Sequence, residues 1–158
     1  MIKFINPSSK PFEKELTFII KNDNKRLHLK YLSDVLRLEK QLSDLLKIEV
    51  IPISYTCSNQ TKIALKNIEF EKAVELLNSN AEEIEQILNQ YPMYEIYRVN
   101  DDFDCKSLLQ EHVEAYDMRY NEIDYNTFFG VKNTITMKGD IDNKTKSFLI
   151  LKYGLMKY

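Results

Sequence analysis

The sequence predicts an α+β fold, with a mainly antiparallel or mixed sheet of about five to seven strands and about four helices largely on one face. Runs of alternating apolar and polar residues near both ends of the chain indicate strands, and runs with apolar residues three and four positions apart indicate helices between them. With 158 residues, 44% of them hydrophobic and 29% charged, the composition is that of a folded globule. We therefore expect a single domain over residues 1–158.

The first predicted element is an N-terminal hairpin. Residues 15–21 alternate, with Leu16, Phe18 and Ile20 on one side, and residues 26–32 alternate again. The turn-forming residues Asn22-Asp23-Asn24 lie between the two runs, as expected for a β-hairpin.

A helix capped by Ser33 is expected next. Its apolar stripe consists of Val35, Leu38, Leu42, Leu45 and Leu46. Residues 48–55 then read as a strand, but Pro52 lacks a ladder donor, which places this strand at a sheet edge or a bulge. Residues 62–67 form a further short strand in this interpretation.

Two more helices and a strand are expected before residue 101. The apolar positions of the helices are Phe70, Ala73, Val74 and Leu77 in the first, and Ile84, Ile87, Leu88 and Tyr91 in the second. Residues 79–82 match a capping box that opens the second helix, and Pro92 ends it. Residues 93–100 read as a strand.

The C-terminal region predicts a second hairpin, formed by residues 134–141 and 147–153 about the turn Asp142-Asn143-Lys144. The last run is apolar on both sides, which favours an interior strand. Its partner presents Thr134, Thr136, Lys138 and Asp140 on one face, which we expect to be wet.

The stretch from Asp101 to Asp117 combines several acids with Cys105 and one of the two histidines, His112. A helix from about Cys105 to Arg119 places one set of side chains on an apolar arc: Cys105, Leu108, Leu109, His112, Val113 and Tyr116. The acids Asp101, Asp102 and Asp104 precede its first turn, where carboxylates cap orphan N–H groups. A capped amphipathic helix thus explains most of these residues.

Charge is unevenly distributed along the chain. Residues 1–81 carry a net charge of +3, residues 82–131 carry −9, and residues 132–158 carry +4. The acidic block disfavours nucleic acid as a partner and can steer a basic one. We therefore expect a small cytosolic, non-catalytic binding protein of the inhibitor, immunity or accessory type, which recognises another protein through an acidic, tyrosine-rich surface. The expected contact residues are Asp101, Asp102, Glu111, Glu114, Asp117, Tyr120, Tyr125 and Phe128.

Two alternative functions remain open. One is a Mg²⁺- or Mn²⁺-dependent hydrolase or nuclease that uses Asp102, Asp104 and Glu111 as metal ligands. An EF-hand calcium loop is disfavoured because Cys105 stands where that loop needs glycine. The other alternative is a nucleic-acid binder that uses the wet sheet face, with contacts from His28, Lys30, Thr136 and Lys138.

Several classes of site are excluded or disfavoured. The three glycines are widely separated and late, so phosphate-cradling and dinucleotide-binding loops are absent. The two histidines are 84 positions apart and no paired-cysteine spacing occurs, so zinc sites are disfavoured, and no cofactor is expected. Cys105 lies two turns from His112, about 10 Å along a helix, too far for a nucleophile and its base. The polar surroundings of Cys57 favour an incidental thiol over a reactive one.

Compartment and origin follow from composition. No run is long and apolar enough for a signal peptide or a membrane span, so we expect a cytoplasmic protein with reduced thiols and no membrane partner. The prevalence of Lys, Asn, Ile and Tyr is typical of AT-rich genomes, including those of mobile elements and phages. The sequence carries no signal for oligomeric state.

Overall fold

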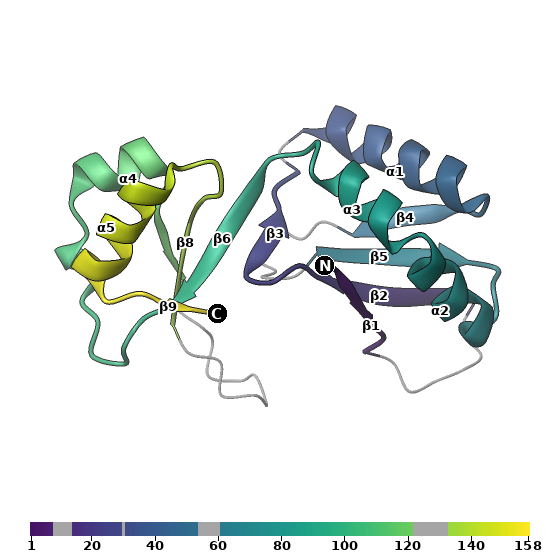
Figure 1. Cartoon of the computed structure of the whole chain (residues 1–158), viewed down its shortest axis with the longest axis horizontal. Helices are drawn as coiled ribbons and strands as arrows, with labels where there is room; N and C mark the ends of the chain where they lie inside the picture. The colour runs from purple at the N-terminus through teal and green to yellow at the C-terminus, as the bar shows by residue number, and fades with distance from the viewer. Residues whose placement is uncertain (8–13, 30, 54–60, 122–132) are drawn as a thin grey trace. The chain divides into compact units, whose positions relative to one another are not determined.

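The computed structural model describes residues 1–7, 14–29, 31–53, 61–121 and 133–158. Within these residues the chain is α+β, as predicted, with nine strands in two antiparallel sheets and five α-helices (Figure 1). It divides into two compact units, Met1–Pro92 (unit 1) and Met93–Tyr158 (unit 2). The expectation of one domain stays a prediction. None of the described helices is long and apolar enough to cross a membrane.

Unit 1 contains a four-stranded antiparallel sheet with the strand order β1-β2-β5-β4. The elements of unit 1 are β1 (Lys3–Ile5), β2 (Glu15–Lys21), β3 (Lys25–Leu27), α1 (Leu32–Leu46), β4 (Val50–Ile53), β5 (Thr61–Lys66), α2 (Phe70–Ser79) and α3 (Ala81–Leu88). Pro52 lies in β4, at an edge of this sheet, so the prediction made from its missing donor is confirmed.

The core of unit 1 forms on one face of the sheet. Leu16 and Phe18 are buried on β2 and lie opposite Leu65 and Ile63 of β5. The buried side chains of the helices are Leu38, Leu42 and Leu46 in α1, Ala73 and Leu77 in α2, and Ile84 and Leu88 in α3. In Figure 1, α1 runs beside β4, and α3 lies next to α1. Most predicted apolar positions of the three helices therefore face the core. The exceptions are Phe70, which is 37% exposed, and Tyr91, which is buried but lies after the end of α3.

The predicted N-terminal hairpin is wrong in its pairing. The turn exists, because Lys25 N donates to Asn22 O (2.9 Å), but β2 pairs with β1 and β5. Of the second predicted strand, residues 26–32, only the part up to Leu27 is a strand. The Leu27 N–H donates to the Thr61 hydroxyl (3.0 Å). His28 N donates to Pro92 O (3.0 Å), so these backbone donors are satisfied away from β2.

The two predicted serine caps in unit 1 do not form. α1 begins at Leu32, before Ser33, and no side chain caps its first turn. The predicted capping box is absent because the Ser79 hydroxyl donates backwards to Glu75 O (2.7 Å), and Asn80 becomes the first residue outside α3. A serine hydroxyl near a helix end often bonds the carbonyl four residues earlier, and here that local bond replaces the cap.

Unit 2 is an antiparallel sheet with helices. Its elements are β6 (Met93–Arg98), the 3₁₀ helix η1 (Cys105–Ser107), α4 (Gln110–Tyr116), β7 (Arg119–Asn121), β8 (Thr134–Lys138), α5 (Asn143–Tyr153) and β9 (Met156–Lys157). β6 pairs with β8 and β9, and β8 also pairs with β7. The predicted strands over residues 93–100 and 134–141 are thus present in shorter form.

The predicted C-terminal hairpin is wrong, because residues 147–153 belong to α5. The Asp142 carboxylate caps this helix by accepting hydrogen bonds from the Thr145 backbone N–H (2.9 Å) and hydroxyl (2.7 Å). Gly154 ends it in the left-handed conformation, with φ of 61°. A run of apolar residues fits a buried strand or a helix equally well by period, and these two caps select the helix.

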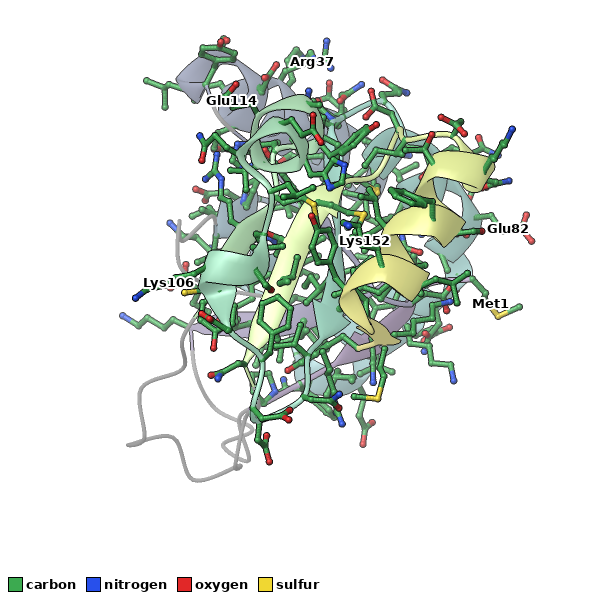
Figure 2. The ribbon with its side chains drawn as sticks, turned by 90° about the vertical axis from the view of Figure 1, so that its left-hand side faces the viewer. Met1, Arg37, Glu82, Lys106, Glu114 and Lys152 are labelled. Carbon is green, nitrogen blue, oxygen red and sulfur yellow. The ribbon has the colours of Figure 1, made fainter. Side chains whose placement is uncertain are left out.

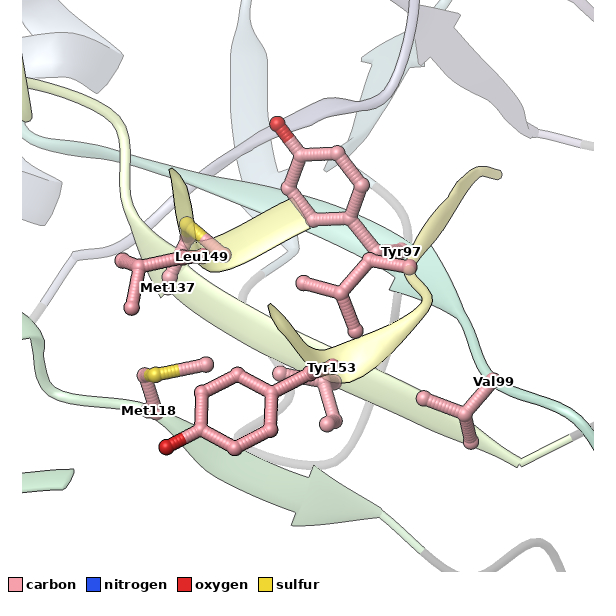
Figure 3. Close-up of a cluster of buried hydrophobic side chains, with 8 residues drawn as sticks. Tyr97, Val99, Met118, Met137, Leu149 and Tyr153 are labelled. Atoms are coloured by element: carbon pink, nitrogen blue, oxygen red, sulfur yellow. The ribbon is translucent and has the colours of Figure 1, made fainter. Parts of the chain in front are cut away.

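The core of unit 2 lies between α5 and one face of β6 and β8. Figure 3 shows part of this cluster, with Tyr153 close to Met118 and Leu149 close to Met137. The buried members are Tyr97, Val99, Met118, Ile135, Met137, Leu149, Tyr153 and Leu155. On β8, Thr134 and Thr136 are both 0% exposed, so the prediction of a wet face is wrong for these residues. Lys138 is exposed.

A buried ionic group fixes α5 to β6. The Glu95 carboxylate is 5% exposed, accepts a hydrogen bond from Lys146 Nζ (2.8 Å) through one oxygen, and accepts one from the Tyr97 hydroxyl (2.6 Å) through the other. Lys146 Nζ also approaches Gly139 O (3.4 Å). Because both carboxylate oxygens and the ammonium have partners, the charges are tolerated in the core.

We expect Lys146→Met to destabilise unit 2 by about 3 kcal/mol, because it leaves the Glu95 carboxylate buried without its counter-charge. Adding Glu95→Gln to Lys146→Met should recover much of that loss, since the neutral amide can still accept from Tyr97. Urea unfolding followed by circular dichroism measures both free energies. Equal stability of the single and double variants would contradict this account of the pair.

The Asp142 cap predicts a pH dependence of α5. Its hydrogen bonds from the Thr145 hydroxyl and backbone N–H lower the pKa of Asp142 below its ordinary value. The cap therefore stabilises the helix above the unfolded-state pKa, near 3.9, and is lost as the pH falls through the lowered folded-state pKa. The protection factors of the α5 amides, which correct for the pH dependence of intrinsic exchange, should fall in this acidic range in the wild type, and Asp142→Asn should remove that dependence. A variant that keeps the wild-type profile would refute the assignment.

Candidate functional site

The predicted helix over residues 105–119 is interrupted in the structure. The Asp104 carboxylate caps η1 by accepting from Lys106 N (2.9 Å), and the backbone is extended at Leu108 and Leu109 before α4 begins. Asp117, with φ of 48°, ends α4. The prediction that an acid caps a helical segment is confirmed for Asp104. Cys105 is exposed, so its predicted place on the apolar arc is wrong.

The Tyr153 hydroxyl joins α4 to α5. It accepts the Leu109 N–H (3.1 Å) and lies 2.6 Å from His112 Nδ1. The ring of His112 also stands edge-on to the rings of Tyr153 and Phe148, at centroid distances of 5.8 and 6.0 Å. The first turn of α4 is therefore held against α5 by one hydroxyl group and three rings.

The contacts of the Tyr153 hydroxyl favour one tautomer of His112. A tyrosine hydroxyl has one proton to donate, and one of its acceptor positions is used by Leu109 N–H. The arrangement that satisfies all three groups has Tyr153 donating to Nδ1, which places the imidazole proton on Nε2, 3.8 Å from a Glu111 carboxylate oxygen. His112 is thus engaged in a structural hydrogen bond.

Three large apolar side chains are exposed around this junction. Leu109 is 42% exposed, Phe148 is 53% exposed and Leu151 is 83% exposed. Leu109 and Phe148 are connected through the His112 and Tyr153 contacts, and Leu151 lies one helical turn after Phe148. We define the α4–α5 surface as Leu109, Phe148 and Leu151 together with the exposed acids Glu111 and Glu114.

Charged side chains of both signs are exposed on the two helices. Glu114 on α4 accepts from the Gln110 side chain (3.0 Å) and is exposed, as is Lys152 on α5 (Figure 2). Lys144 and Lys152 lie at the two ends of the exposed stripe of α5 that contains Phe148 and Leu151. The two helices therefore expose acidic, basic and apolar side chains.

The predicted contact residues fall into three groups. Asp101, Asp102, Glu111 and Glu114 are exposed. Asp117 is half-buried, bonded to the Tyr94 hydroxyl and to Arg119 Nε (3.2 Å), and Tyr120 is half-buried with its ring stacked on Phe103 at 5.8 Å. Tyr125 and Phe128 lie outside the described residues.

The alternative sites receive little support. Among the described residues, no three His, Cys, Asp or Glu side chains are close enough to hold a metal, so Asp102, Asp104 and Glu111 are not brought together. For the proposed nucleic-acid face, Thr136 is buried and His28 is half-buried. Lys30 and Cys57 lie outside the described residues.

Sequence reasoning missed the exposed residues of α5, because an interior strand over residues 147–153 would bury Phe148 and Leu151. A local signal was present: Asp142 with Thr145 three residues later is typical of a helix start, and Gly154 is typical of a helix end. With the helix recognised, a stripe of exposed positions follows from its period: Lys144, Ser147, Phe148, Leu151 and Lys152.

We expect Tyr153→Phe to lower the free energy of unfolding by about 1–3 kcal/mol, because Leu109 N–H and His112 Nδ1 lose their partner. The ¹⁵N shifts of His112 should show the Nε2–H form in the wild type and lose that preference in the variant. Tyr158→Phe, at an exposed tyrosine, is the matched control. An unchanged histidine spectrum in Tyr153→Phe would contradict the proposed bond.

Comparisons with known proteins leave the chain without an assigned relative. No family model matches it, and neither a curated protein nor a solved structure matches it.

Proposed function

We propose that this chain is a small, non-catalytic binding protein of the inhibitor, immunity or accessory type that recognises another protein through the α4–α5 surface. In this proposal exposed acids attract a basic partner, and the apolar side chains between the helices provide the buried area of the complex. The residues that carry the interaction are Leu109, Glu111, Glu114, Phe148 and Leu151, with Asp101 and Asp102 contributing to the field.

The exposure of Phe148 and Leu151 carries the proposal. The opposite face of α5 is well packed, with Leu149 at 0% exposure, so this helix buries one apolar stripe and leaves a second one in water. Adjacent large apolar side chains on a surface often mark a protein–protein interface. Apolar anchors surrounded by polar groups are the usual anatomy of such interfaces.

Electrostatics support a basic partner. Residues 82–131 carry 12 acidic and 3 basic residues, and the exposed acids before and on α4 belong to this block. Such a field raises the rate of encounter with a basic surface, and its effect decreases with added salt. The apolar contacts, in contrast, act on the rate of dissociation.

The surface is also rigidly supported. The Tyr153 hydroxyl holds Leu109 at the start of α4, and the His112 ring packs against Phe148. Side chains whose backbone and neighbours are already fixed lose less conformational freedom when a partner binds. This support favours recognition by a preformed surface.

The first test is capture of the natural partner from host extract with the wild-type chain as bait. The Leu151→Asp and Phe148→Asp variants should lose that partner, because each places a charge at the centre of the contact. Leu32→Asp on α1 is the matched control, since Leu32 is 73% exposed and lies in unit 1. Loss of the partner in the control alone, or retention in both α5 variants, would contradict the proposal.

The captured partner then allows a kinetic test of steering. Glu111→Lys with Glu114→Lys should slow association at least about tenfold at low salt, with a smaller effect near 0.5 M salt, because screening weakens exposed charges. Surface plasmon resonance gives both rate constants. An association rate that is the same for the variant and the wild type at low salt would rule out acidic steering.

A further inference from the structure

The sheet of unit 1 has a second face, opposite its core. Phe70 of α2 stacks on Phe18 of β2 with ring centroids 6.3 Å apart, so this helix lies over the buried, even-numbered positions of β2. The residues that alternate with the core positions along β1, β2, β4 and β5 therefore point to the other side of the sheet. We define the outer patch on this side as Lys3, Ile5, Ile19, Lys21, Ile53 and Lys62.

A band of apolar groups crosses the outer patch from β1 to β4. Ile5 lies opposite Ile19, and Lys62 lies opposite both Ile19 and Ile53. Ile5 is 44% exposed, and Ile19 and Ile53 are half-buried. Side chains that lie opposite one another on the same face are in contact distance. The three isoleucines and the aliphatic stem of Lys62 thus form one continuous band.

Three lysines lie together at one end of the strands. Lys3 and Lys21 are exposed and lie directly opposite each other on β1 and β2. Lys62 is the diagonal neighbour of Lys21, because it lies opposite Ile19 two residues earlier. Like charges in these positions repel. None of the three lysines has an ion pair with a described residue.

The other end of the same strands is balanced in charge. Lys66 of β5 lies opposite Glu15 of β2, and its Nζ is 3.3 Å from a carboxylate oxygen of Glu49. The excess of positive charge on this side of the sheet is therefore local to the outer patch. An anionic partner would supply the carboxylates that the three lysines lack.

The chemistry of the outer patch favours an acidic helix over other anions. Sheets that bind nucleic acid usually stack bases on aromatic rings, and the described strands of unit 1 place no aromatic ring on this side. Anchoring to a bilayer needs apolar side chains that reach into its interface, whereas two of the three isoleucines are half-buried. An amphipathic helix combines an apolar stripe with charged flanks, and helices commonly cover sheet faces.

We propose that the outer patch binds an acidic amphipathic helix of a second protein. The apolar stripe of that helix packs on the three isoleucines, and carboxylates on its flank pair with the three lysines. The patch lies in unit 1 and uses no residue of the α4–α5 surface, so this inference goes beyond the proposed function. The chain would then carry two binding surfaces of opposite charge.

The test is a titration of the full ¹⁵N-labelled chain with a synthetic peptide of about 18 residues, long enough to form a helix. The peptide has leucine along one face and glutamate on both flanks. Saturable shifts are expected at the amides of Ile5, Ile19, Lys21 and Lys62, with a dissociation constant on the order of 0.1–1 mM. The same peptide with lysine in place of each glutamate should leave these amides unshifted.

Matched variants separate the lysine cluster from net charge. Lys3→Gln with Lys21→Gln should weaken the acidic peptide about fivefold at low salt, as expected for two exposed ion pairs. The fold should be retained, because the substitutions remove a repulsive pair. Lys40→Gln with Lys72→Gln makes the same charge change on α1 and α2 and should leave the affinity unchanged. Ile19→Thr should weaken the peptide at low and at high salt.

Four results would overturn the proposal. The first is the absence of saturable shifts at the outer patch up to about 5 mM acidic peptide, above the expected constants. The second is equal weakening by the two double variants. The third is a dependence of these shifts on protein concentration without peptide, which would assign the patch to a second copy of the chain. The fourth is tighter binding of a single-stranded oligonucleotide or of phosphatidylglycerol vesicles at the same amides.

Discussion

The α4–α5 surface depends on the hydrogen bonds of the Tyr153 hydroxyl group. α4 has seven residues, and a helix of that length is unstable by itself in water. The Tyr153 hydroxyl supplies what the isolated helix lacks, because it accepts the Leu109 N–H at the helix start and contacts His112 one turn further on. The position of α4 and the exposure of Leu109 both depend on this contact.

Packing of α5 explains why its apolar residues are exposed. Lys146, Leu149 and Tyr153 are three, four and seven positions apart, so they lie on one side of the helix and face β6 and the core. The buried carboxylate of Glu95 fixes that orientation by binding Lys146. Because one side of α5 is committed in this way, Phe148 on the other side must point to solvent, and its exposure is a consequence of the fold.

Sequence patterns correctly predicted the elements that depend on residues close together in the sequence. The period of α1 and the missing donor of Pro52 were sufficient, because each depends on neighbouring residues or on one backbone group. Both hairpins failed for different reasons: the partner of β2 is chosen by contacts distant in sequence, and the apolar run at residues 148–151 has no period that separates strand from helix. The acids of the candidate surface were predicted from the charge distribution. Its exposed apolar residues could be identified only from the orientation of α5 in the structure.

In the proposed complex, the charges on and beside the α4–α5 surface affect specificity more than affinity. Glu111 and Glu114 lie on α4, and Lys144 and Lys152 lie on α5, with Phe148 and Leu151 between the two lysines. Exposed ion pairs contribute little net affinity, so in the proposed complex burial of the apolar side chains would supply most of it. The same charges would disfavour a partner docked in the reverse orientation, since like charges would then face each other. A surface built in this way would select both the identity and the direction of its partner.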